Sequence, residues 1–130
     1  MVSFIIGLGT TAAIVAFAEV FRKIDLEFFA SLSLAVIPFI YIGFSIDPEA
    51  LALTIPAASL FLVFAYRGYK KNYLFTVMGL ALHGLWDVAF PHISAVAPPG
   101  YDVFCITIDV LLAIYFYLKL KPVFLRRSPR

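Results

Sequence analysis

The sequence is poor in cysteine and in charged residues. Its single cysteine, Cys105, excludes an intrachain disulfide framework and leaves the redox compartment undetermined. Asp, Glu, Lys and Arg make up only 14% of the chain, and no basic stripe with interleaved aromatics is present, so nucleic acid is not an expected partner. The chain also lacks a nucleotide-binding loop, a zinc-type cysteine pair, an HExxH motif and a nucleophile elbow, which argues against a serine hydrolase.

Hydrophobic residues are abundant instead, at 63% of the 130 residues. Soluble domains contain about 45–50%, so this composition predicts an integral membrane protein with one transmembrane helical domain, residues 1–130. Backbone groups inside lipid must be paired within their own segment, which favours an all-α bundle. Five apolar runs are long enough for helices that cross the hydrocarbon core. The five predicted transmembrane helices are 2–21, 26–46, 50–66, 73–90 and 102–118.

The basic residues predict the orientation of this bundle. All of them lie in the first connection, in the third connection and at the C-terminus, which share one side only if there are five spans. Positively charged loops stay in the cytoplasm, so we expect the N-terminus outside and the C-terminus inside, in a multi-pass protein of the cytoplasmic membrane. The first run has no basic residue before it, whereas Arg22 and Lys23 follow it, so it is expected to be a retained span rather than a signal peptide.

Ionisable residues inside the fourth and fifth runs are the main functional signal. An ionisable side chain at the centre of a span costs about 2.5–3.5 kcal/mol on insertion scales. His83 and Asp87 are four residues apart and share a helix face with Gly79, and Trp86 lies beside them. Asp102, Cys105 and Asp109 form one face of the next helix. Antiparallel packing would bring His83, Asp87 and Asp109 together at mid-depth.

Three uses of such a cluster are open. Two acids and a histidine make a proton donor and acceptor group, with His83, Asp87 and Asp109 as catalytic residues. Gly79, Trp86, Asp102 and Cys105 would then line the substrate site. The same groups are also ligands for a divalent metal, which is neither identified nor required by the sequence. In the third alternative, the residues have no chemical role and only hold two helices together by hydrogen bonds.

Two other polar residues are additional candidates for the site. Glu19 lies near the inner end of the first run, where Arg22 and Lys23 follow it and favour an interfacial ion pair. His92 follows Pro91 near the outer surface, where the fourth helix is expected to end or kink because proline frees the Asp87 carbonyl.

The first run contains small residues at helical spacing. Gly9 precedes Ala13, and Ala12 precedes Ala16, by four residues each. This spacing favours close helix packing within the bundle, or a contact between two copies in a homo-oligomer.

The C-terminal half resembles a family of small multi-pass membrane proteins catalogued as a domain of unknown function. The resemblance rests on Leu82-His83, Trp86-Asp87-Val88, Cys105 and Asp109, together with Tyr66-Arg67-Gly68, Tyr73, Gly79, Ala113 and Phe116. The family pattern implies further histidines after the Trp-Asp pair. Here Phe90 and Pro91 occupy those positions and the nearest histidine is His92, which argues against a multi-histidine metal site.

We therefore expect a membrane-embedded enzyme that uses a His/Asp acid–base site on a lipid-like or isoprenoid small molecule, of isomerase, cyclase or hydrolase type. Sterol isomerases and membrane terpene cyclases offer a chemical analogy, since they too place acids, histidine and tryptophan inside helical bundles. The alternative is a small homo-oligomeric transporter or channel subunit in which the same residues relay protons or ions. The third hypothesis is a non-catalytic membrane interaction protein.

Overall fold

The computed structural model is an all-helical bundle, and it describes residues 1–21, 23–45, 48–92 and 97–127. Of these, residues 126 and 127 are described by their backbone only. The α-helices are α1 (Val2–Val20), α2 (Leu26–Val36), α3 (Phe39–Phe44), α4 (Pro48–Lys70), α5 (Leu74–Ala89) and α6 (Tyr101–Arg127), and a short 3-10 helix, η1 (Phe90–His92), follows α5. Five helical segments, with α2 and α3 counted as one and η1 counted with α5, are long and apolar enough to cross a membrane.

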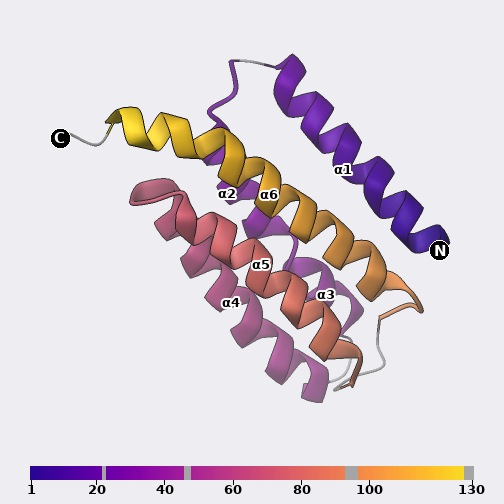
Figure 1. Cartoon of the computed structure of the whole chain (residues 1–130). Coiled ribbons are helices and arrows are strands. Elements are labelled where there is room, and N and C mark those ends of the chain that lie inside the picture. The colour runs from indigo at the N-terminus through magenta and orange to yellow at the C-terminus, as the bar shows by residue number, and fades with distance from the viewer. Residues whose placement is uncertain (22, 46–47, 93–96, 128–130) are drawn as a thin grey trace.

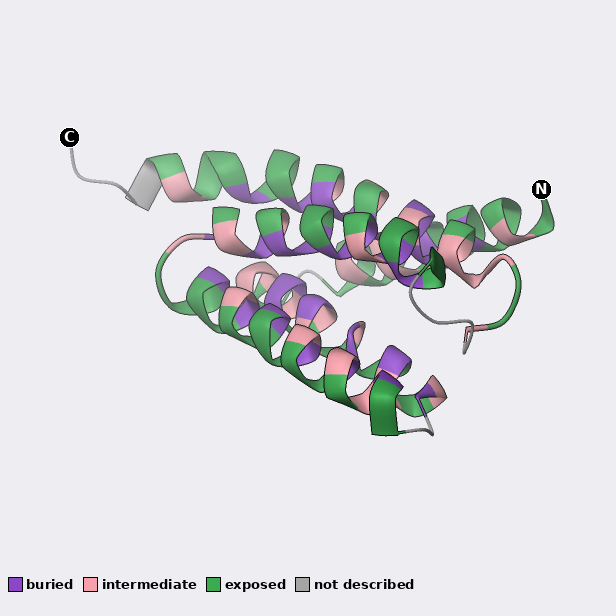
Figure 2. Cartoon of the chain, turned by 90° about the horizontal axis from the view of Figure 1, so that it is seen from below, coloured by how far each residue is buried: buried purple, intermediate pink, exposed green. Residues whose placement is uncertain are grey.

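The helices pack in an order that places α5 at the centre. Helix α5 lies between α4 and α6, α2 packs against α4 and α5, and α1 lies along the outer side of α6 (Figure 1). Buried positions are on the faces that the helices turn toward one another, and exposed positions cover the outside (Figure 2). Many of these exposed residues are large and apolar, for example Leu60, Leu85 and Leu118. An exposed apolar surface of this extent is typical of a protein that contacts lipid or other partners.

Proline divides the second predicted span. The Asp25 side chain caps α2 by accepting hydrogen bonds from the backbone N–H groups of Glu27 and Phe28. Helix α2 then ends at Val36, and α3 begins after Pro38, because proline has no N–H to donate and its ring crowds the preceding turn. The predicted span 26–46 thus corresponds to the apolar segment Leu26–Phe44, interrupted at Pro38, and residues 46–47 lie outside the described part. The break changes the direction of the segment that carries Tyr41.

Two helices extend beyond the apolar runs from which they were predicted. Helix α4 spans Pro48–Lys70 rather than 50–66, and α6 spans Tyr101–Arg127 rather than 102–118. Both continue into segments rich in basic residues, whose long side chains can reach water from the end of a helix. Pro56 and Pro122 are tolerated within these helices. By contrast, Pro91 ends α5 at Ala89 as expected, and the chain continues as η1.

Helix α1 meets α6 through a glycine other than the expected one. A Cβ atom at Gly7 would lie 3.0 Å from the Phe104 carbonyl oxygen and from the Thr107 Cβ, whereas a Cβ at Gly9 would meet nothing within 4 Å. Gly9 and Ala13 face outward. The close packing predicted for the first span is thus present, but on a different face of the helix.

A second close approach joins α4 to α5 and gives a stability prediction. A Cβ at Gly68 would lie 2.9 Å from the backbone nitrogen of Thr76, too near for the rigid helix to accept without moving. Gly68→Ala is therefore expected to lower the free energy of unfolding by about 1–3 kcal/mol, measured by denaturant titration in detergent micelles. The matched control is Gly43→Ala, where the new Cβ meets nothing within 4 Å. Equal losses in the two variants would show that the close approach at Gly68 is not the cause.

Candidate functional site

The site is built on α5, whose helical spacing places His83 and Asp87 on one inward face. Neither side chain is accessible to solvent. His83 Nδ1 lies 3.5 Å from Asp87 Oδ2. The i,i+4 relation predicted from sequence therefore brings an imidazole and a carboxylate together inside the bundle.

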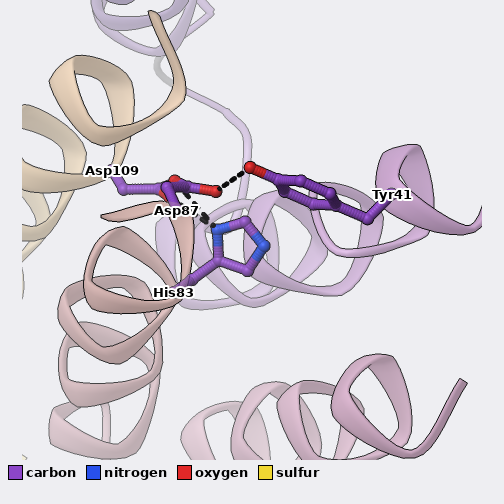
Figure 3. A network of polar contacts seen from close by, with 4 residues as sticks. All are labelled: Tyr41, His83, Asp87 and Asp109. Atoms are coloured by element: carbon purple, nitrogen blue, oxygen red, sulfur yellow. Dashed lines mark hydrogen bonds and ion pairs between the residues drawn. The ribbon is translucent and has the colours of Figure 1, made fainter. Parts of the chain in front are cut away.

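Helix α6 adds the third side chain. Asp109 is also fully buried, and its Oδ2 lies 2.7 Å from His83 Nδ1 in a His–Asp hydrogen bond (Figure 3). An ionised Asp109 accepts this bond from the Nδ1–H group. The predicted convergence of His83, Asp87 and Asp109 is therefore present. Its predicted position at mid-depth in a membrane stays a prediction. By helical rise, Asp109 lies about 12 Å from the first residue of α6 and about 8 Å from its middle, so the cluster is on the N-terminal side of the centre of that helix.

Tyr41 on α3 is a fourth member of the cluster that the sequence analysis missed. Its hydroxyl donates a hydrogen bond of 2.7 Å to Asp87 Oδ1, and its side chain is buried. The break at Pro38 positions α3 so that this ring points toward the carboxylates (Figure 3). A tyrosine within an apolar run gives no periodic signal, so the proline was the only feature pointing to this segment.

Three buried polar atoms of the cluster have no hydrogen-bond partner in the described part of the chain: His83 Nε2, Asp87 Oδ2 and Asp109 Oδ1. Nε2 points away from the carboxylates (Figure 3). Buried polar groups are nearly always paired, and an unpaired one costs about 1–3 kcal/mol. Buried polar groups without a protein partner are typical of sites where a ligand, a proton or a water molecule binds to them.

Aromatic rings surround the polar atoms. Phe61 of α4 meets the His83 ring edge-on at a centroid distance of 4.9 Å, and Phe90 contacts Tyr41 in the same way at 4.6 Å. Tyr101 lies beyond Tyr41, with 6.0 Å between their ring centroids. The polar cluster is therefore enclosed by ring edges and faces rather than by charged groups.

The cluster has an excess of acid. Among the described residues, the ion pairs of Asp87 and Asp109 are both with His83, and no Lys or Arg joins them. Even an imidazolium would balance only one of two carboxylates. The second negative charge must be balanced by a proton or by a bound cation, because burying it alone is costly.

A divalent metal would use the same atoms. His83, Asp87 and Asp109 each offer a ligand atom, and these atoms lie within 4.8 Å of one another. Imidazole with carboxylates is a suitable donor set for several divalent metals. However, a metal bound through Nδ1 would have to replace the hydrogen bond from His83 to Asp109. The geometry therefore fits a hydrogen-bonded His–Asp pair better than a metal site that uses Nδ1.

The remaining predicted site residues lie around the cluster or away from it. Trp86 is half-buried and stacks near Phe90, at 5.4 Å between ring centroids. Gly79 lies where α5 packs against the side chain of Leu34 and the Cβ atom of Phe64. Cys105 is buried one turn before Asp109, and Asp102 is half-buried in the first turn of α6. Their role in binding a substrate stays a prediction.

Glu19 and His92 lie apart from the cluster. Glu19 Oε1 is 2.6 Å from Lys119 Nζ and accepts a hydrogen bond from the Tyr115 hydroxyl, which ties α1 to α6. Lys119 is thus a partner of Glu19 that the sequence analysis did not name, and the expected partner Arg22 lies outside the described residues. His92 is exposed in η1.

The contact between Tyr41 and Asp87 gives a second stability prediction. Tyr41→Phe removes the hydroxyl and leaves Asp87 Oδ1 buried without its partner. We expect a loss of about 1–3 kcal/mol in the free energy of unfolding, measured in detergent micelles. Tyr66→Phe, at an exposed ring on α4, is the control and should change stability little. A Tyr41→Phe variant as stable as the control would mean that the hydrogen bond to Asp87 contributes nothing.

Comparison with known proteins gives a family but no activity. No curated protein and no solved structure matches the chain. A family model described as a family of unknown function (DUF6010) matches residues 2–121, well beyond the C-terminal half that carries the resemblance. The chain therefore belongs to this family of unknown function, DUF6010.

Proposed function

We propose that this protein is a membrane-embedded enzyme that transfers a proton on a lipid-like or isoprenoid substrate, with Nε2 of His83 as the reacting atom. One observation carries the proposal: Nδ1 is held by Asp109 at 2.7 Å, while Nε2 is buried and has no partner. A carboxylate on one ring nitrogen fixes the orientation of the imidazole and leaves the other nitrogen to exchange a proton.

The surroundings suit a reaction through a carbocation. Protonated His83 donates from Nε2 to an alkene carbon of the substrate, and the cation loses a proton from a neighbouring carbon back to Nε2, so the double bond moves and no co-reactant is needed. The rings of Tyr41 and Phe61 lie beside the imidazole, with centroids 6.0 and 4.9 Å from its own, and aromatic π-electrons stabilise a nearby cation. Asp87 and Asp109 balance its charge, and Tyr41 positions Asp87 by its hydrogen bond.

The proposed setting is the cytoplasmic membrane, with the N-terminus outside. The C-terminal end of α4, the α4–α5 connection and the C-terminal part of α6 lie toward one end of the bundle (Figure 1). These segments carry Arg67, Lys70, Lys71, Lys119 and Lys121. A concentration of positive charge at one end favours the cytoplasmic side for that end.

An apolar hollow at the opposite end supports entry of a lipid from the outer leaflet. It has a volume of about 240 Å³ and lies between the start of α1 and the start of α6, with Ile6, Pro99, Tyr101 and Phe104 in its wall. Tyr101 also contacts Tyr41, which bonds to Asp87. The rings of Tyr101 and Tyr41 thus lie between the hollow and the polar cluster, and both would have to move to open a path for a substrate.

A proton relay in a transporter is the second candidate. The observation in its favour is the complete burial of His83, Asp87 and Asp109, which suits a relay as well as a reaction sealed from water. In that case a homo-oligomer would conduct protons or ions, and no lipid would be altered.

The experiment that tests the enzyme proposal uses purified protein in micelles with a total membrane lipid extract in D₂O. Proton transfer through carbon leaves deuterium in a lipid, which mass spectrometry detects. We expect labelling with the wild-type protein and with His92→Gln, whose imidazole is exposed in η1, but none with His83→Gln. Labelling that survives His83→Gln would refute the assignment. An unlabelled extract, together with a pH-gradient leak in vesicles that His83→Gln abolishes, would establish the relay instead.

A further inference from the structure

A narrow apolar groove runs between α2 and α4 on the outer surface, with a volume of about 230 Å³. Small, largely buried residues form its floor, and large exposed residues form its sides. They are Ser31, Ala35 and Ala65 on the floor and Phe28, Leu62, Tyr66 and Tyr69 on the sides. The only hydroxyl on the floor, that of Ser31, is already bonded to Thr76 at 3.0 Å. The floor therefore offers no unpaired polar group to an occupant.

A polar hollow adjoins this groove at the end of α4. It has a volume of about 370 Å³ and is lined by Lys70, Lys71 and Asn72, with Glu27 from α2. Tyr69 lines both the groove and the hollow, so the two spaces adjoin at this residue. Apolar groove and polar hollow together match a molecule with a hydrocarbon chain and a polar head.

The charge of the hollow indicates which head it takes. Lys70 and Lys71 contribute two positive charges against the one negative charge of Glu27. The ammonium group of Lys70 lies 5.0 Å from the centre of the Tyr69 ring, which holds it beside the junction of the two spaces. A net positive hollow at the basic end of the bundle complements an anionic phosphate.

We propose that this surface binds one anionic phospholipid of the cytoplasmic leaflet, with an acyl chain in the groove between α2 and α4 and the phosphate between Lys70 and Lys71. The inference rests on the membrane orientation proposed above but not on any catalytic role of His83. It gives the protein a lipid site at the end of the bundle opposite the hollow near Tyr101.

Native mass spectrometry of the full chain in detergent tests the headgroup, with phosphatidylglycerol and phosphatidylcholine as probes. We expect tighter binding of phosphatidylglycerol. A lysine near an anionic lipid surface contributes about a fivefold change in affinity, so Lys70→Ala/Lys71→Ala should weaken phosphatidylglycerol by at least that factor and remove the preference. Lys121→Ala is the control, because its ammonium also lies over a tyrosine ring but outside the hollow. Equal binding of the two lipids, or an equal loss with Lys121→Ala, would overturn the proposal.

A second pair of variants tests the groove. Leu62→Trp places a larger side chain in the side of the groove, and Leu60→Trp makes the same change at an exposed position of α4 that does not line it. Leu62→Trp is expected to weaken binding of phosphatidylglycerol, and Leu60→Trp to leave it unchanged. If both variants bind as the wild type does, no acyl chain occupies the groove. His83→Gln should bind phosphatidylglycerol normally, so failure of the proposed reaction and failure of this site give different results.

Discussion

Asp109→Asn is expected to lower the rate of deuterium incorporation into the substrate lipid by about 10⁴-fold while the protein remains folded. The carboxylate accepts the Nδ1–H of His83 at 2.7 Å and so keeps Nε2 free to exchange a proton. An asparagine of nearly the same shape can turn its amide N–H toward Nδ1 instead. The proton then resides on Nε2, and the imidazole is held in the wrong tautomer. Mass spectrometry of the lipid after incubation in D₂O measures the rate.

The control for this variant is Glu49→Gln, which removes an acid from the first turn of α4, away from the cluster. It should retain the wild-type rate. Full activity in Asp109→Asn would show that the carboxylate does not orient His83. Loss of the folded state, detected as aggregation in size-exclusion chromatography or loss of the helical circular dichroism signal, would show that Asp109 is needed for the fold rather than for the reaction.

The all-helical architecture, with five segments long and apolar enough to cross a membrane, could be predicted from the sequence because each segment contains an apolar run that only a helix accommodates in lipid. Helix ends could not be predicted in the same way. Hydropathy detects where apolar residues stop, whereas α4 continues to Lys70 and α6 to Arg127 because a helix can continue through a basic segment. Proline in a span kinks some helices and divides others, so the presence of Pro38 alone did not determine that the segment divides into α2 and α3. Pro56 and Pro122, inside continuous helices, illustrate the difference.

The candidate site was predictable to the extent that helical periodicity determines it. The spacing of His83 and Asp87 fixes their shared face, and the antiparallel neighbour brings Asp109 to the same level. Tyr41 was not predictable, because its approach to Asp87 depends on how α3 turns after Pro38. Likewise, small residues at Gly9 and Ala13 do not indicate which side of α1 faces α6, and the contact is at Gly7.

His83→Leu is expected to cost about 3–5 kcal/mol of unfolding free energy, because it leaves Asp87 and Asp109 buried without the base that pairs with both. Titration with SDS in mixed micelles measures this loss. Leu85→Ala, on the exposed face of α5, is the control and should stay within about 0.5 kcal/mol of the wild type.

The double variant His83→Leu/Asp109→Leu separates a buried charge pair from ordinary packing. When both partners become apolar, no uncompensated charge remains at this contact, so the double variant should be more stable than the sum of the single losses predicts, by about 1–3 kcal/mol. Asp87 keeps its hydrogen bond from Tyr41 in the single variants and in the double variant. The contribution of that bond to the free energy of unfolding therefore cancels when the double variant is compared with the sum of the single variants. Strictly additive losses would mean that His83 and Asp109 do not stabilise each other, and the His–Asp pair from which the proposed chemistry starts would then lack an energetic basis.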